Sequence, residues 1–90
     1  MRRISLDGKM MTDKENTHIY LKEKLELPDY YGNNLDALWD LLSFESRPTE
    51  IQIINISMIL KNLGDYGYSL IEVFSEVNHE GGRVKSEFIY

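Results

Sequence analysis

The stretch Glu50-Ile51-Gln52-Ile53-Ile54-Asn55-Ile56 decides the fold of this chain. It follows Pro48, is rich in β-branched residues and nearly alternates apolar with polar side chains, a pattern typical of a β-strand. We predict that it forms the central strand of a sheet, with the elements on either side of it in the chain packed around it.

Upstream, the chain predicts a short strand and a helix. Residues Arg2 to Leu6 alternate and end at the turn dipeptide Asp7-Gly8, which indicates the strand. Thr12-Asp13-Lys14-Glu15 fits a capping box with Thr12 as the N-cap, so a helix should run from about Asp13 to Leu25 and stop before Pro28. The apolar side of this helix is expected to consist of Ile19, Leu21 and Leu25.

A turn-rich segment, Pro28 to Asn34, precedes a second helix that should reach about Leu42, with Asn34 as its N-cap. At about 100° per residue, Asp36 and Asp40 point away from the apolar side of this helix, and Trp39 lies on the flank. The apolar side comprises Leu35, Leu38 and Leu42, with Leu41 at its edge.

Downstream of the central strand, the chain predicts two more helices and a last strand. Ser57 to Leu63 should be a short helix closed at Gly64, and the last helix should begin between Asp65 and Ser69 and end at Gly81-Gly82. We expect Leu70, Val73, Phe74 and Val77 on its core side, Glu72 and Glu76 facing outward, and a strand from Val84 to Ile89. Because strands separated by helices require crossover connections, the pattern predicts an α/β fold with a small parallel sheet covered by helices.

The composition is that of one small folded domain over residues 1–90. With 42 % hydrophobic and 28 % charged residues, the chain is not disordered, and it is too short to divide into two cores. It has no cysteine, which excludes disulfides and thiolate metal sites. The first residues lack the apolar run of a signal peptide, and no stretch reaches the roughly eighteen apolar residues that span a membrane, so we expect a cytoplasmic protein.

The charge is unevenly distributed along the chain. The net charge of −5 disfavours binding to nucleic acid or an anionic membrane and favours a basic partner. Two windows, residues 25–46 and 62–82, contain no Lys or Arg and together carry −9, whereas the rest of the chain carries +4. This asymmetry indicates a candidate binding field, with a charge that serves solubility alone as the alternative interpretation.

Candidate catalytic residues are few. His18 and His79 are isolated from other ligand-type side chains, so each is expected to be an ordinary surface or half-buried residue. Asp36 and Asp40, one helical turn apart, could form an acid–base pair or half of a metal site, but a solvated helix face is the simpler interpretation. Their neighbours are residues of the kind found in protein interfaces: Tyr30, Gly32, Asn34 and Trp39. The sequence contains no metal-spaced cluster and no Gly-rich phosphate loop, so we expect no metal or cofactor, and a solvated face and a protein interface both stay open for Asp36 and Asp40.

The stretch Leu25-Glu26-Leu27-Pro28-Asp29-Tyr30-Tyr31-Gly32-Asn33-Asn34-Leu35-Asp36-Ala37-Leu38-Trp39-Asp40 closely resembles the barstar family of intracellular ribonuclease inhibitors. Val73-Phe74-Ser75-Glu76 and Glu80-Gly81 are also similar, and the same order of elements extends the resemblance over residues 1–90. The resemblance implies one barstar-like domain with a three-stranded parallel sheet flanked by about four helices. It also implies the activity of the family, which is to block the active site of a secreted, guanyl-preferring ribonuclease of the barnase type without catalysing a reaction.

The resemblance further implies which residues contact the ribonuclease. By position these are Tyr30, Gly32, Asn34, Leu35, Asp36, Trp39, Asp40, Val73 and Glu76. Asp40 would be the central anchor, lying where the substrate phosphate would lie and facing the catalytic His and the Arg and Lys side chains of the nuclease. Trp39 is left open between a contact and a core residue that supports the helix. The free inhibitor is expected to be a monomer.

Residues 43–48 depart from the family pattern, because this segment is one residue shorter and lacks the family's glycine. Phe44 and Glu45 are expected to replace the aromatic and acidic contacts of that segment. The resemblance leaves open whether the Arg47–Pro48 bond is cis. An adaptor or antitoxin-like module that binds another basic protein through the same acidic face is the alternative function.

Overall fold

A computed structural model describes residues 1–78 and 82–90 of the chain. Its elements follow the order β1-η1-α1-α2-β2-α3-α4-β3, in which η1 is a single 3-10 turn, Gly8–Met10. The strands are β1 (Arg2–Asp7), β2 (Thr49–Ile54) and β3 (Val84–Phe88), and the α-helices are α1 (Lys14–Lys24), α2 (Leu35–Ser43), α3 (Ile56–Leu63) and α4 (Asp65–Val77). This order confirms the predicted α/β fold.

The strands form a parallel sheet in the order β1-β2-β3, which is three-stranded over the described residues. Ile51 of β2 lies opposite Ile4 of β1 and Ser86 of β3, so the isoleucine-rich strand is central, as predicted. The strand ends at Ile54, two residues earlier than expected. Asn55 has a φ of 56° and its Nδ2 donates a hydrogen bond to Oδ1 of Asp7 at 2.9 Å, which turns the chain into α3.

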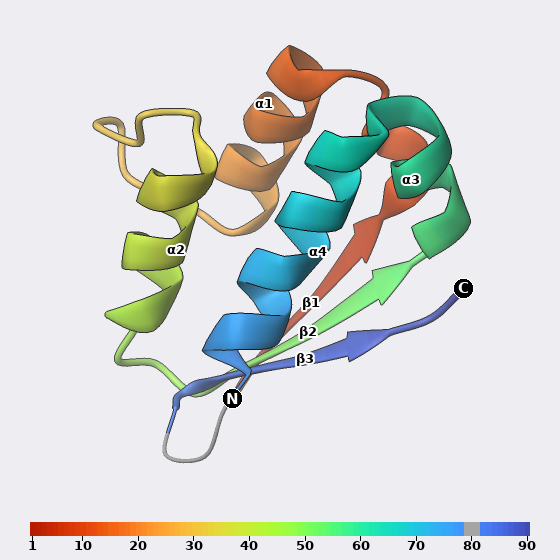
Figure 1. Ribbon diagram of the computed structural model, residues 1–90. Helices are drawn as coiled ribbons and strands as arrows, with labels where there is room; N and C mark the ends of the chain where they lie inside the picture. The colour runs from red at the N-terminus through yellow and green to blue at the C-terminus, as the bar shows by residue number, and fades with distance from the viewer. Residues whose placement is uncertain (79–81) are drawn as a thin grey trace.

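The helices lie on one side of the sheet, and no described element covers the other side (Figure 1). β2 reflects this arrangement, because Ile51 and Ile53 are 1 % exposed whereas Glu50 and Gln52 are exposed. A parallel sheet usually has helices on both faces, and one with an open face needs this alternation of apolar and polar residues. None of the helices in the described part of the chain is long and apolar enough to cross a membrane.

Helix α1 differs from its prediction in its cap and its buried side. Asp13, not Thr12, is the N-cap, and its side chain accepts a hydrogen bond from the backbone N–H of Asn16 at 2.8 Å. Ile19 is 53 % exposed, so its assignment to the apolar side was wrong. The reason is helical geometry, because a side that buries Leu21 and Leu25 also turns Thr17 and His18 inward and Ile19 outward.

Helices α2 and α4 match their predicted buried sides. Leu38 and Leu42 of α2 are buried, as are the expected core residues of α4, Leu70, Val73, Phe74 and Val77. The end of α4 was predicted too late, since the helix stops at Val77. Asn78 caps it, and its side chain donates to the backbone O of Ser86 on β3 at 3.0 Å, which draws the chain toward the sheet. Of the expected cap, Gly81-Gly82, Gly81 lies outside the described residues and Gly82 is not part of the helix.

Candidate partner-binding site

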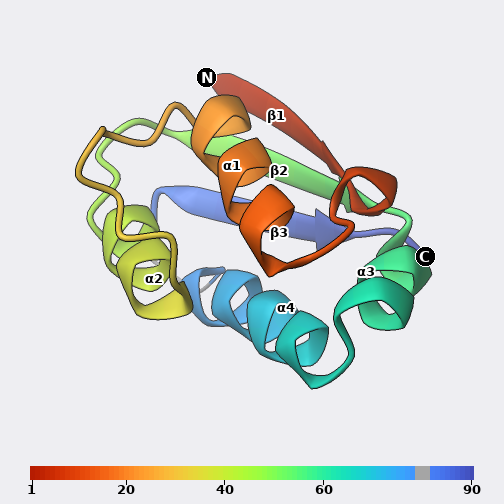
Figure 2. The ribbon, with the colours of Figure 1, turned by 90° about the horizontal axis from the view of Figure 1, so that it is seen from above.

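A groove lies between α2 and α4, which run side by side in both views of the ribbon (Figures 1 and 2). It is open to solvent and has a volume of about 410 Å³. α2 contributes Leu35, Asp36, Trp39 and Asp40 to its lining, and α4 contributes Val73 and Glu76. The structure therefore brings together residues from the two stretches that carry the family resemblance. We call this surface the acidic groove.

The sequence of α2 determines how its two aspartates are presented. Leu38 and Leu42 are buried against the core, so Asp36 and Asp40 are left on the exposed face of the helix, one turn apart. The helix begins at a defined residue, because the side-chain oxygen of Asn34 accepts a hydrogen bond from the N–H of Ala37 at 2.8 Å. Asp36 lies in the first turn, where the helix dipole favours a negative charge.

The carboxylates of the acidic groove are not neutralised by any part of the chain that the structure describes. Asp36, Asp40 and Glu76 form no ion pair or side-chain hydrogen bond with any residue that the structure describes. Three negative charges thus share one groove at the junction of the two base-free windows. Such a surface has a strongly negative potential and suits a ligand that supplies several cationic donors.

The apolar residues of the groove lie at different depths. Val73 is 8 % exposed and packs with the core, so only a small part of it is accessible to a partner. Trp39 is 41 % exposed and belongs to the wall of the groove, consistent with its predicted place on the flank of α2. Apolar surface beside carboxylates is typical of protein interfaces, where burial excludes water from the polar contacts.

In the loop before α2, residues 28–34, two adjacent tyrosines differ in exposure. Tyr30 is 80 % exposed, whereas Tyr31 is 6 % exposed and its N–H donates to the backbone O of Pro28 at 2.9 Å. Gly32 is exposed, and its carbonyl oxygen accepts a hydrogen bond from Nδ2 of Asn34 at 3.2 Å. We call residues 28–34 the recognition loop. It adjoins the N-terminal end of α2 but does not line the acidic groove.

Phe44 and Glu45 follow α2 and also lie outside the groove lining. Phe44 is 83 % exposed. Glu45 is engaged with its own chain, because Oε1 accepts hydrogen bonds from the backbone N–H and from Nε of Arg47, both at 2.9 Å. The hydrogen bond from the Arg47 side chain is the main cause that lowers the pKa of Glu45 to about 2. A partner would have to compete with Arg47 for this carboxylate.

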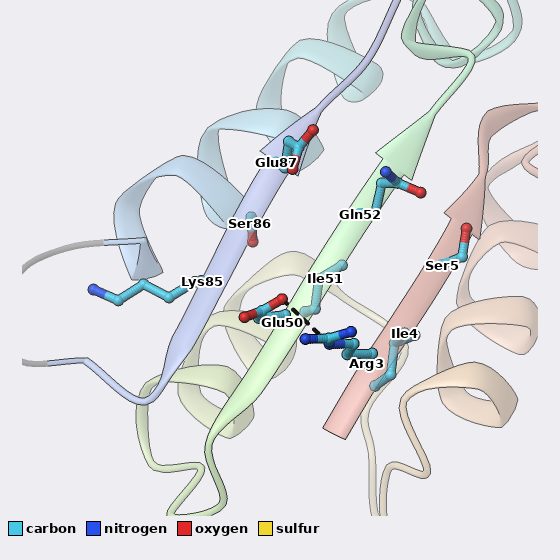
Figure 3. Close-up of a pocket in the computed structure, with 9 residues that line it drawn as sticks. All are labelled: Arg3, Ile4, Ser5, Glu50, Ile51, Gln52, Lys85, Ser86 and Glu87. Carbon is cyan, nitrogen blue, oxygen red and sulfur yellow. Dashed lines mark ion pairs between the residues drawn. The ribbon is translucent and has the colours of Figure 1, made fainter. Parts of the chain in front are cut away.

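A hollow of about 690 Å³ lies on the open face of the sheet (Figure 3). Arg3, Glu50 and Lys85 form one cross-strand row there, and Nε of Arg3 lies 3.7 Å from Oε2 of Glu50. Ser5, Gln52 and Glu87 form the next row. Charges of both signs alternate on this shallow face, so it has no field of one sign and does not indicate a charged partner.

His18 is the main residue whose environment the sequence did not predict. It is 2 % exposed and lies between two phenols, with Nδ1 2.5 Å from Oη of Tyr31 and Nε2 2.6 Å from Oη of Tyr66. Burial lowers its pKa below the usual value. The expectation of a surface or half-buried histidine was wrong, because the spacing of His18, Leu21 and Leu25 puts them on one side of α1. His79 lies outside the described residues.

Within residues 1–78 and 82–90, no group of three or more His, Cys, Asp or Glu side chains is arranged to hold a metal ion. Every peptide bond within these two ranges is trans, including Arg47–Pro48. The short 43–48 segment thus reaches β2 without a cis bond, and Thr49 is hydrogen-bonded to Arg47 and Arg83.

Comparison with known proteins places these features in a family. The family model described as "Barstar (barnase inhibitor)" matches residues 1–90. A Bacillus subtilis (strain 168) protein named "Putative ribonuclease inhibitor YrdF" is 40 % identical over 89 residues, covering 98 % of this chain and 94 % of that protein. Both matches agree with the resemblance found in the sequence. The chain therefore belongs to the barstar family, a family of ribonuclease inhibitors.

Proposed function

We propose that this protein inhibits a secreted, guanyl-preferring ribonuclease of the barnase type by covering its active site with the acidic groove and the recognition loop. The observation that carries the proposal is the grouping of Asp36, Asp40 and Glu76. These carboxylates come from two helices, line one groove and have no cationic partner among the described residues. Membership of a ribonuclease-inhibitor family supports the same conclusion.

The proposed mechanism is imitation of the substrate. A ribonuclease must concentrate cationic donors where the phosphate of RNA lies, so carboxylates at matching positions can satisfy those donors without offering a bond to cleave. Asp40 is the central anchor in this proposal, with Asp36 and Glu76 on either side. Because helices fix the backbone of all three before contact, little backbone freedom is left to lose on binding.

The remaining contact residues exclude water and set the register of docking. Tyr30 projects from the recognition loop and can cover the active-site cleft, and Trp39 and Phe44 offer further exposed aromatic surface. Gly32, Asn34, Leu35 and Val73 complete the proposed surface, and Glu45 is its least accessible carboxylate. An interface of standard size would bury about 1,600 Å² in total.

The negative field of the groove should also accelerate encounter with a basic nuclease, in a manner that salt weakens. The biological role that follows is protection of the cell that makes the nuclease. In this proposal the inhibitor acts in the cytoplasm, as a monomer that binds one ribonuclease molecule.

The decisive experiment titrates the purified protein into a barnase-type ribonuclease and follows RNA cleavage. Loss of activity that is complete near one equivalent is the expected result. Unchanged cleavage at excess inhibitor overturns the proposal and favours the adaptor or antitoxin-like function. Cleavage of RNA by the protein alone, dependent on a divalent metal, would instead identify an enzyme. The Asp40→Ala variant is the control, since it should inhibit far more weakly at the same concentration.

A further inference from the structure

A buried histidine joins three separate parts of the chain. His18 belongs to α1, and its two ring nitrogens lie 2.5 Å and 2.6 Å from the phenol oxygens of Tyr31 and Tyr66. Tyr31 is part of the recognition loop, and Tyr66 lies in the first turn of α4. The imidazole therefore links the recognition loop to α1 and α4. The groove and the resemblance account for neither His18 nor Tyr66.

The two hydrogen bonds fit a neutral imidazole, which buries no charge. A neutral ring has one N–H donor and one acceptor nitrogen, so one tyrosine accepts a hydrogen bond and the other donates one. Neither phenol oxygen has a second hydrogen-bond partner among the described residues. An imidazolium could still donate to both phenol oxygens. However, its charge would be buried at His18, and the phenol that donates to the neutral ring would lose its acceptor, both of which are costly.

The groups around the cluster do not favour a positive ring. The rings of Tyr31 and Tyr66 pack against His18, with centroids 5.7 Å and 5.9 Å away. From α1, Nζ of Lys14 lies 4.5 Å from the centroid of the Tyr66 ring, which adds a second cation nearby. No carboxylate in the described ranges pairs with His18. A protonated His18 would therefore have no counter-ion.

We infer that His18 is a positioning residue, which through Tyr31 and Tyr66 holds the recognition loop in its partner-binding shape and releases it when the imidazole is protonated. Tyr31 and Tyr30 are adjacent, so fixing Tyr31 inward keeps Tyr30 outward and lowers the entropy lost on docking. For its role in binding, the inference rests on the proposed function. The shape of the loop is a property of the free protein and can be measured without a partner.

The test compares three tyrosine variants, each of which removes one hydroxyl. Tyr66→Phe removes the hydroxyl at Nε2 of His18. Tyr68→Phe, on the same helix, removes a hydroxyl from a side chain that is 63 % exposed, and is the matched control. Tyr20→Phe removes the oxygen that accepts from the N–H of Asp7 at 2.9 Å. This hydrogen bond involves neither His18 nor the recognition loop, so the variant controls for general destabilisation.

The readouts are hydrogen exchange at the Tyr31 amide of the free protein and the dissociation rate from a barnase-type ribonuclease, both at neutral pH. Tyr66→Phe should increase both by about two- to tenfold, the effect of losing one hydrogen bond. Tyr68→Phe and Tyr20→Phe should leave the loop amide unchanged. Equal exchange at Tyr31 in Tyr66→Phe and Tyr68→Phe overturns the inference.

A fourth variant, His18→Gln, tests the response to protonation. Glutamine offers a donor and an acceptor but does not titrate. Loop protection in the native protein should fall only once the pH lies clearly below 6.5, the ordinary pKa of histidine, because burial lowers the pKa of His18. In His18→Gln the protection should stay level. The same fall in both proteins contradicts the inference. If the native protein binds no barnase-type ribonuclease, the proposed function fails, and exchange at Tyr31 still decides the role of His18.

Discussion

Asp40 on α2 and Glu76 on α4 line the same groove, although β2 and α3 separate them in the chain. Neither carboxylate is paired within the described residues, so both are available to a cationic partner. The pairing of α2 with α4 thus turns two separate acidic segments into one binding surface. This relationship is the basis of the predictions on binding.

Asp40→Ala should weaken the complex with the ribonuclease by about 2–5 kcal/mol, because it leaves cations of the partner buried and unpaired. The loss should appear in the dissociation rate, measured by stopped-flow fluorescence. The free energy of unfolding should stay within about 0.5 kcal/mol of the native value, since Asp40 is exposed and unpaired.

The matched control for Asp40 is Glu72→Ala. Glu72 is also an exposed acidic residue on a helix that borders the groove, but it does not line it. Equal losses of affinity from the two variants would show that the complex depends on total charge, which contradicts a central anchor at Asp40.

Asp29→Asn should lower the association rate and its dependence on salt while leaving the dissociation rate nearly unchanged. Asp29 is fully exposed in the recognition loop, 3.7 Å from Nζ of Lys22, so it contributes to the field at the rim of the proposed interface. Glu87→Gln, on the open face of the sheet, removes the same charge away from the groove and is the control. A change in dissociation as large as that of Asp40→Ala argues against the rim position.

Local pattern was enough to predict the central strand, the parallel sheet and the buried sides of α2 and α4. Ile51, Ile53, Leu38 and Phe74 occupy positions that periodicity alone identifies. Two of the errors fall where a residue outside the local pattern decides. Asn55 is hydrogen-bonded to Asp7, 48 residues away, at the end of β2, and Asn78 to Ser86, eight residues on, at the end of α4. The error at Ile19 was one of local helical geometry.

In the candidate site, too, the features set by local pattern were predicted and the others were not. The helical spacing of Asp36 and Asp40 predicted their exposure, and the resemblance supplied the residues of α4 and the loop that would join them. The spacing of His18 with Leu21 and Leu25 is a local signal for its burial. No local pattern predicts its partners, because Tyr31 and Tyr66 are 13 and 48 residues away in the chain. Glu45 was expected as an available acid, but the hydrogen bonds from Arg47 depend on a loop conformation that the pattern does not specify.

Asn34→Ala should lower the free energy of unfolding by about 1 kcal/mol, because α2 loses its N-cap hydrogen bond to Ala37. Urea denaturation followed by circular dichroism measures the loss. Asn34→Ser keeps a capping oxygen and should recover most of the stability. If Asn34→Ser restores the stability but not the affinity for the ribonuclease, the Asn34 amide has a contact role besides its cap. An Asn34→Ala protein as stable as the native one would contradict the capping role.

The Glu45–Arg47 pair predicts a stability difference that depends on pH. The pKa of Glu45 is about 2 in the folded protein and near its ordinary value of 4.5 when unfolded, so the unfolded chain takes up the proton first as the pH falls. The stability contributed by Glu45 is therefore complete above about pH 4.5 and disappears as the pH approaches 2. Glu45→Gln should be less stable than the native protein at neutral pH, and the gap should close in acid.

Urea titrations at several pH values between neutral and 2 measure this gap directly. The difference between native protein and variant isolates Glu45 from the other carboxylates that titrate in the same range. Glu50→Gln is the control, because its 3.7 Å contact with Arg3 joins two exposed side chains and should contribute about 0–1 kcal/mol. A Glu45→Gln gap that stays constant down to pH 2 would mean that Arg47 does not hold this carboxylate in solution, which would leave Glu45 available to the ribonuclease.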